Sequence, residues 1–141
     1  MRVFLDANVL FSAARSDSSI RRLLQELVRN EHLCIADGYV WEEARRNLAV
    51  RTPEGPRSLQ GIASLIELHT GFAGSGVEVG EINLPDKDIP ILASAVALAC
   101  DALVTGDRTH FGSLYGTTIH GVTIHSPRSL AELMRDRMHD Q

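Results

Sequence analysis

The sequence has few aromatic residues, a single lysine and no long apolar stretch. Aromatic residues make up 5% of the 141 residues, and Lys87 is the one basic side chain that is not arginine. No apolar run approaches the roughly 18 residues that a membrane-spanning helix needs. Asp6 and Asn8 interrupt the apolar N-terminal stretch, which argues against a secretory signal. We therefore expect a cytoplasmic protein without a membrane span.

An excess of positive charge is also missing. The formal net charge is −4 at pH 7, which argues against a module that binds nucleic acid through bulk charge alone. It does not exclude a nuclease, because a cluster of active-site acids lowers the net charge and bound divalent cations compensate it locally. The charge balance therefore leaves enzymes that act on nucleic acid open.

Cysteine is scarce as well. The two cysteines, Cys34 and Cys100, lack the spacing of metal ligands, and we expect reduced thiols in the core, with a disulfide as the alternative. The length suits one domain that covers residues 1–141 and is long enough to bury a core.

Apolar periodicity predicts strands and helices that alternate along the chain. The predicted strands cover 3–5, 33–36, 77–79, 102–104 and 121–124. The predicted helices cover 17–30, capped by Asp17 or Ser18, then 39–50, 59–69, a segment with Ile91 to Ala99, a short turn at 110–115, and a last helix that starts at Ser126-Pro127. The glycine-rich segment 71–80 is expected to be a connector, and the tail 135–141 to fray. Such alternation predicts an α/β fold with a mostly parallel central sheet.

Four acids occupy comparable positions in this pattern. Asp6 and Asp107 each follow a predicted strand, while Glu43 and Asp88 lie in early turns of predicted helices. In a parallel α/β sheet, the carboxyl ends of the strands and the first turns of the following helices lie at one edge. We therefore expect the four carboxylates to share one crevice.

Carboxylates that lie close together need a compensating cation or a proton. Oxygen ligands favour a hard ion such as Mg²⁺ or Mn²⁺, which supports hydrolysis of a phosphodiester. Each acid also has a structural alternative. Glu43 and its neighbour Glu42 fit a solvated helix surface, Asp88 and Asp86 fit helix caps, and Asp107 fits the start of a turn.

Several other polar residues lie close to the acids in sequence. Arg45, Arg46 and Arg108 suit contacts with RNA phosphates, and equally suit solvated surface positions. His110 suits substrate contact or proton transfer, although three residues after a turn it fits a polar surface better. These four residues carry no prediction on their own.

Four short motifs together resemble the PIN-domain family, and within it the VapC-like toxin ribonucleases of toxin–antitoxin pairs. The motifs are Phe4-Leu-Asp6-Ala-Asn8-Val-Leu10, Glu43-Ala-Arg-Arg-Asn-Leu48, Asp88-Ile-Pro-Ile-Leu-Ala93 and Leu103-Val-Thr105-Gly-Asp107. They follow the family's order and spread over nearly the whole chain.

The resemblance implies a three-layer α/β/α sandwich with a mostly parallel sheet and a Mg²⁺- or Mn²⁺-dependent endoribonuclease. Its catalytic and metal-binding acids fall on Asp6, Glu43, Asp88 and Asp107, and Asn8 and Thr105 fall where polar residues support the site. The implied partners are an RNA substrate and a separate antitoxin protein. One position departs from the family: Ala7 stands where many members have Thr, so a hydroxyl near the metal is missing.

Other functions remain open at this point. One alternative is a PIN-like module that binds RNA or protein with little or no nuclease activity. Another is a phosphoryl-transfer protein with Asp6 as its nucleophile, although no second acid lies beside Asp6 as a receiver domain requires. The apolar faces of the first helices also leave a homodimer open. The identity of the RNA does not follow from the residues.

Overall fold

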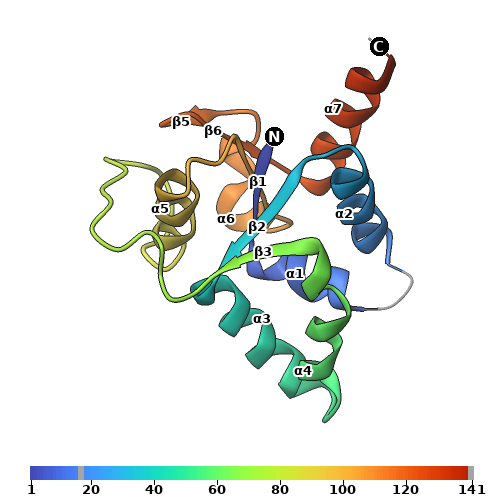
Figure 1. Cartoon of the computed structure of the whole chain (residues 1–141). Helices are drawn as coiled ribbons and strands as arrows, with labels where there is room; N and C mark the ends of the chain where they lie inside the picture. Colours follow the sequence, from blue (N-terminus) through green and yellow to red (C-terminus); the bar gives the residue numbers. More distant parts are fainter. Residues whose placement is uncertain (16–17, 140–141) are drawn as a thin grey trace.

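A six-stranded sheet forms the centre of the computed structural model, which describes residues 1–15 and 18–139. The strand order is β3-β2-β1-β4-β6-β5, and all neighbours are parallel except the antiparallel pair β5 and β6 (Figure 1). The strands are β1 (Arg2–Leu5), β2 (Leu33–Asp37), β3 (Ile66–His69), β4 (Ala102–Val104), β5 (Thr118–Ile119) and β6 (Val122–His125).

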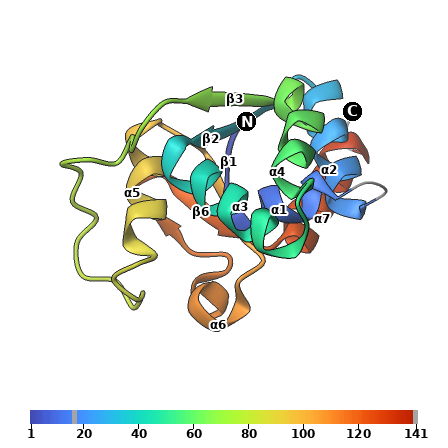
Figure 2. The same ribbon diagram turned by 90° about the horizontal axis from the view of Figure 1, so that it is seen from below.

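Helices cover both faces of this sheet. Figure 2 shows α5 on one side and α1, α2 and α7 on the other, while α3 lies against α1. The helices are α1 (Ala7–Ala14), α2 (Ser19–Arg29), α3 (Gly38–Arg51), α4 (Gly55–Ser58), α5 (Ile89–Ala97), α6 (Arg108–Phe111) and α7 (Pro127–His139). Short 3₁₀ turns cover Leu59–Gly61, Ala63–Leu65 and Gly112–Leu114. The predicted α/β/α sandwich with a mostly parallel sheet is confirmed.

The strand order changes direction between β1 and β4. Connections from β1 lead outward to β2 and β3, and the chain then crosses back to place β4 on the other side of β1. Ligands of open α/β sheets bind outside the carboxyl ends of the strands at such a switch point. Asp6 follows β1 directly, and Thr105 follows β4 directly. The topology therefore places both segments in the expected crevice.

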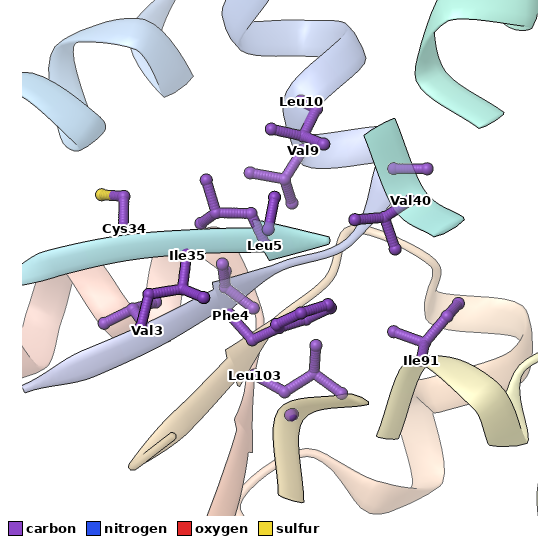
Figure 3. Close-up of a cluster of buried hydrophobic side chains, with 14 of the residues drawn as sticks. Val3, Phe4, Leu5, Val9, Leu10, Cys34, Ile35, Val40, Ile91 and Leu103 are labelled. Atoms are coloured by element: carbon purple, nitrogen blue, oxygen red, sulfur yellow. The ribbon is translucent and has the colours of Figure 1, made fainter. Parts of the chain in front are cut away.

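The core lies between the sheet and its helices. Figure 3 shows Phe4 of β1 and Leu103 of β4 on the side of the sheet that faces Ile91 of α5, and Leu5 on the side that faces Val9 and Leu10 of α1. All of these residues except Val9 and Ile91 are fully buried, and those two are nearly so. Side chains alternate across a strand, so β1 supplies apolar surface to both layers.

The prediction of a helix over 59–69 is wrong. Only 3₁₀ turns form at its start, and Ile66–His69 becomes the edge strand β3, paired with Cys34–Asp37 of β2. Leu59 and Ile62 are buried as the helical spacing suggested, because two successive 3₁₀ turns repeat every three residues. The backbone groups along the free edge of β2 favour a partner strand, and this tertiary pairing overrides the local pattern.

The glycine-rich segment 71–80 is a connector, as predicted, but the predicted strand 77–79 does not form. The segment is held tightly at two points. A Cβ atom at Gly74 would lie 2.6 Å from the Ser94 backbone nitrogen of α5, and one at Gly38 would lie 2.8 Å from the Gly71 nitrogen. Glycine is therefore required where this loop packs against α5 and against the start of α3.

Most predicted helix ends are correct. Ser18 accepts a hydrogen bond from the Arg21 backbone and caps α2, and Ser126 accepts one from the Ser129 backbone at the start of α7. Asp17, the alternative cap, lies outside the described residues. The predicted fraying from residue 135 is wrong up to His139, which ends α7. Helix α1 and the short strand β5 had no counterpart in the predicted elements.

Both cysteines are buried free thiols, as predicted. Burial raises the pKa of Cys34 and of Cys100 to about 12, so neither thiol is reactive at neutral pH. Among the described residues, no helix is long and apolar enough to cross a membrane.

The central position of Leu103 leads to a stability prediction. Replacing Leu103 with Ala should lower the free energy of unfolding by about 2–5 kcal/mol, because the truncated side chain leaves a cavity between β4 and α5. Leu68 of the edge strand is 44% exposed, so Leu68→Ala should change it by less than about 1 kcal/mol. Urea unfolding followed by circular dichroism measures both. Equal losses would contradict this account of the core.

Candidate metal centre

Asp6 is fixed between the first strand and the first helix. Its backbone nitrogen donates to Val104 O of β4 at 3.1 Å, and its carbonyl accepts from Val9 N and Leu10 N of α1. Its Oδ1 accepts from Ala7 N at 2.7 Å, which makes Asp6 the cap of α1. Only 3% of the residue is exposed. The carboxylate is therefore held firmly at the junction of β1, β4 and α1.

The second oxygen of Asp6 is held by Thr105 and Asn8. Thr105 Oγ1 donates to Asp6 Oδ2 at 2.7 Å, and Asn8 Nδ2 donates to the same oxygen at 3.2 Å. Asn8 Oδ1 accepts from Gly106 N at 2.8 Å, and Thr105 Oγ1 accepts from Asp107 N at 3.1 Å. Asn8 and Thr105 thus join the ends of β1 and β4 around Asp6. A supporting role of both residues in a metal site stays a prediction.

Burial raises the pKa of Asp6 from its ordinary value of 3.8 to about 6. The hydrogen bonds from Thr105 and Ala7 lower it, while the negative charges of Glu43 and Asp88 raise it. Desolvation outweighs the hydrogen bonds because the charged form loses its water at this position. Glu43 and Asp88 therefore lie close enough to Asp6 for their charges to act on it.

Asp88, Asp107 and His110 form the tightest group of potential metal ligands. One ligand atom from each lies within 4.8 Å of the other two, and among the described residues no other such group of three occurs. His110 Nδ1 lies 2.8 Å from Asp88 Oδ2 and 2.9 Å from Asp107 Oδ2. Asp6 and Glu43 are not members of this inner group.

The carboxylate of Asp88 is buried but does not cap the helix that it precedes. Asp88 occupies the cap position of α5, but its side chain makes no capping hydrogen bond. It is 7% exposed, and its buried Oδ2 has no hydrogen-bond partner among the described residues; the same holds for His110 Nδ1. Burial raises the pKa of Asp88, and the charges of His110 and Lys87 lower it. Buried polar atoms without partners are costly, and a cation between them would satisfy both.

Asp107 has one structural contact and one free oxygen. Its Oδ1 accepts from His110 N at 3.2 Å and caps the short helix α6, which agrees with the turn alternative for this residue. Its Oδ2 faces His110 Nδ1 and Asp88. Asp107 can therefore cap α6 with Oδ1 and offer Oδ2 to an ion at the same time.

Each candidate acid differs from its acidic neighbour in sequence, either in its contacts or in its exposure. Glu42 is paired with Arg45 in an exposed contact, and this hydrogen bond lowers the pKa of Glu42. The negative charge of Glu43 instead contributes to the raised pKa of Tyr39 and of Asp6. Asp86 is exposed, whereas Asp88 is buried. Arg45 is thus occupied by Glu42, while Arg46 and Arg108 lie exposed.

A second buried carboxylate holds the helices that carry Glu43 and Asp88. Asp37 is fully buried; its Oδ1 accepts from Val40 N of α3, and its Oδ2 accepts from Ser94 Oγ of α5 at 2.6 Å and from Ala73 N at 3.1 Å. Ser94 Oγ also accepts from Gly74 N. Asp37 therefore fixes the start of α3 relative to α5 and to the connector.

Sequence reasoning missed two parts of this arrangement. Asp37 received no role from the sequence, although an Asp directly before a helix indicates a cap. His110 was noted but not placed in the site. Its spacing of three from Asp107 is a helical spacing, which could have indicated that the two side chains lie on one face.

Solved structures of low sequence identity share this fold. VapBC2 from Rickettsia felis, solved bound to a DNA fragment from their promoter, has a TM-score of 0.67 at 17% identity, over 89% of this chain and 98% of that one. VapBC-1 from nontypeable Haemophilus influenzae has a TM-score of 0.59 at 12% identity, over 91% and 99%. VapC20 from Mycobacterium tuberculosis, a sarcin-ricin loop cleaving toxin, has a TM-score of 0.53 at 10% identity, over 79% and 94%.

The chain has the PIN-domain fold. No family model matches the sequence, and no curated protein matches it either. At identities of 10–17%, the similarity shows the fold alone. Within this PIN-domain fold, the acids Asp6, Glu43, Asp88 and Asp107 come from four different segments, at the carboxyl ends of β1 and β4 and at the starts of α3 and α5.

The raised pKa of Asp6 leads to a pH prediction. In the metal-free protein, the folded state binds the proton of Asp6 more tightly than the unfolded state does. Protonated Asp6 therefore stabilises the fold below about pH 4, and this stabilisation is lost as the pH rises through about 6. The loss amounts to at most about 3 kcal/mol. The stability of Asp6→Asn relative to the parent should therefore rise between about pH 4 and pH 8, as measured by urea unfolding in a chelator.

The exposed Asp86 supplies the matched control, since Asp86→Asn should follow the parent across this pH range. A difference between parent and Asp6→Asn that does not change with pH would contradict the assigned cause.

Proposed function

We propose that this chain is a divalent-metal-dependent endoribonuclease and the toxin of a toxin–antitoxin pair. The observation that carries the proposal is the pair of buried atoms Asp88 Oδ2 and His110 Nδ1, which lack hydrogen-bond partners among the described residues and lie beside Asp107 in a PIN-domain fold. A group of acids of this kind favours a bound cation, and an acid-lined cation site suits phosphodiester hydrolysis.

The residues of the crevice fit a hard divalent ion. Asp6, Glu43, Asp88 and Asp107 would hold Mg²⁺ or Mn²⁺, since carboxylate oxygens are the ligands that these ions prefer. A bound ion of this kind supplies Lewis acidity toward a phosphoryl oxygen and lowers the pKa of water. The four acids are thus proposed as both catalytic and metal-binding residues.

The chain's own contacts prepare Asp6 for this role. Thr105 and Asn8 hold its Oδ2, and Ala7 N holds its Oδ1, so the carboxylate has one fixed orientation. The hydroxyl that many family members carry at position 7 has no equivalent there, and Thr105 supplies a hydroxyl to Asp6 from β4 instead. With a pKa of about 6, Asp6 is mostly ionised at pH 7 and above even without an ion.

Similarity to the solved structures supports the choice of substrate and partner. VapC20 is described as a toxin that cleaves the sarcin-ricin loop, which supports RNA as the substrate class. The Rickettsia and Haemophilus structures are both of VapBC pairs, which supports a separate antitoxin protein as partner. A cytoplasmic location and a homodimer remain predictions of the sequence.

Two neighbouring pairs of acids provide a sharp test. Glu43→Gln and Asp88→Asn should lower metal-dependent cleavage of structured RNA by about 100-fold or more, because each removes a charge that is worth several kcal/mol near the ion. Glu42→Gln and Asp86→Asn remove the same charge one or two positions away and should stay within about threefold of the parent. Cleavage is measured by gel electrophoresis with Mg²⁺, with Mn²⁺ and with a chelator.

All five proteins are purified in the same way, so a contaminating nuclease would affect them equally. If the parent binds RNA but does not cleave it with either ion, the chain is a binding module instead. If Glu42→Gln and Glu43→Gln lose the same activity, the assignment of Glu43 is wrong.

A further inference from the structure

His110 lies beside Asp88 and Asp107 and belongs neither to the acidic quartet nor to the core. Its Nδ1 lies between the two carboxylates, 2.8 Å from Asp88 Oδ2 and 2.9 Å from Asp107 Oδ2. The side chain is about one quarter exposed, but the Nδ1 atom itself is buried. A nitrogen therefore lies where the acids converge.

The turn that carries His110 is anchored on both sides. Asp107 caps α6, and the next residue, Phe111, is fully buried and donates its backbone N–H to Asp107 O at 2.9 Å. Farther on, the Tyr115 hydroxyl donates to Thr105 O at 2.8 Å and ties the chain back to the end of β4. The backbone that carries His110 is thus anchored at both ends, and the imidazole extends from it toward Asp88 and Asp107.

The contacts of Nδ1 with Asp88 Oδ2 and Asp107 Oδ2 have the length of ion pairs, which an imidazole forms only when it is protonated. Nδ1 and Asp88 Oδ2 nevertheless lack a hydrogen-bond partner of suitable geometry among the described residues. Ligands about 2.1 Å from an octahedral ion, on neighbouring corners, lie roughly 3 Å apart. The two nitrogen–oxygen distances also match this spacing, as they would if the three side chains shared an ion.

We propose that His110 Nδ1 is a direct ligand of the divalent ion, next to Asp88 and Asp107. The site then holds mixed nitrogen and oxygen ligands and selects first-row transition ions over Mg²⁺. Imidazole is a ligand of borderline transition ions, whereas Mg²⁺ prefers oxygen alone. This inference rests on the proposed metal site but does not depend on RNA as the substrate.

A different role of His110 predicts the opposite result. A protonated imidazole would be a resident counter-cation of Asp88 and Asp107, and an incoming ion would have to displace it. Removal of that cation would then strengthen the binding of every divalent ion. The sign of the change in affinity therefore separates a ligand from a competitor.

The test uses the whole metal-free chain and measures binding without RNA. Isothermal titration calorimetry gives the affinities for Mg²⁺, Mn²⁺ and Co²⁺ of the parent, His110→Ala and His110→Gln. His69→Gln is the matched control, because His69 also contacts a carboxylate, Glu67 at 2.9 Å, outside the crevice. Urea unfolding in a chelator checks that each variant is folded.

We expect both His110 variants to bind Co²⁺ and Mn²⁺ roughly 10- to 100-fold more weakly, as is found when groups that support a metal site are lost. His110→Gln, which offers an amide oxygen, should keep its Mg²⁺ affinity within a few fold of the parent. His69→Gln should bind all three ions like the parent. Electron spin echo spectra of bound Mn²⁺ should show coupling to a nitrogen nucleus in the parent and not in His110→Gln.

The outcomes separate this inference from the proposed function. Unchanged or tighter binding of Co²⁺ and Mn²⁺ by the His110 variants, or the absence of nitrogen coupling in the parent, would overturn the ligand role while the metal-dependent nuclease stands. A parent that binds none of the three ions would overturn both. The spectrum of the parent decides the matter even if the variants fail to fold.

Discussion

The hydrogen bond from Thr105 Oγ1 to Asp6 Oδ2 joins the two strands on which the rest of the crevice depends. It links residues 99 positions apart, directly after β1 and directly after β4, where the strand order changes direction. Asn8 and Gly106 add a second link across the same junction. With these contacts in place, Asp107 and α6 have a fixed position relative to Asp6. The polar crevice and the central strand pairing therefore form one unit.

A second fixed point places the remaining acids. Asp37 ties the first turn of α3 to Ser94 of α5, and the connector packs against α5 through Gly74 and against the start of α3 through Gly71. The direction of α3 sets the position of Glu43, and the start of α5 sets the position of Asp88. The two anchors, Thr105 to Asp6 and Ser94 to Asp37, are both hydroxyl–carboxylate contacts that are buried. A buried carboxylate of this kind is tolerated because its oxygens are hydrogen-bonded.

Much of the fold could be predicted from periodicity, because β1, β2 and β4 are apolar runs followed by an acid and the helices between them have regular apolar faces. The edge strand β3 could not be predicted in this way. Its residues Ile66–His69 continue a helical spacing from Leu59, and only the free edge of β2, a feature of the assembled sheet, makes them a strand. Strand β5 has two residues, too few for any pattern.

The candidate site was predictable to the extent that it follows strand ends and helix starts. Asp6 and Asp107 stand after strands, Asp88 stands at the start of a helix, and Glu43 was separated from Glu42 by its resemblance to a known motif. The structure adds a physical basis for that choice, since Glu42 is paired with Arg45. Local signals could have marked Asp37 as a helix cap and His110 as a neighbour of Asp107. Their contacts with Ser94 and Asp88, 57 and 22 positions away in sequence, could not be predicted.

The close approach of Gly74 to α5 has a consequence for how the proposed activity can be lost. A side chain at position 74 would overlap the backbone at Ser94, and the helix that carries Asp88 would have to move. The connector contains none of the four acids, yet its glycine controls where one of them lies. Under selection against the protein's activity, inactivating changes should therefore collect at Gly74 and Gly38 as well as at the acids.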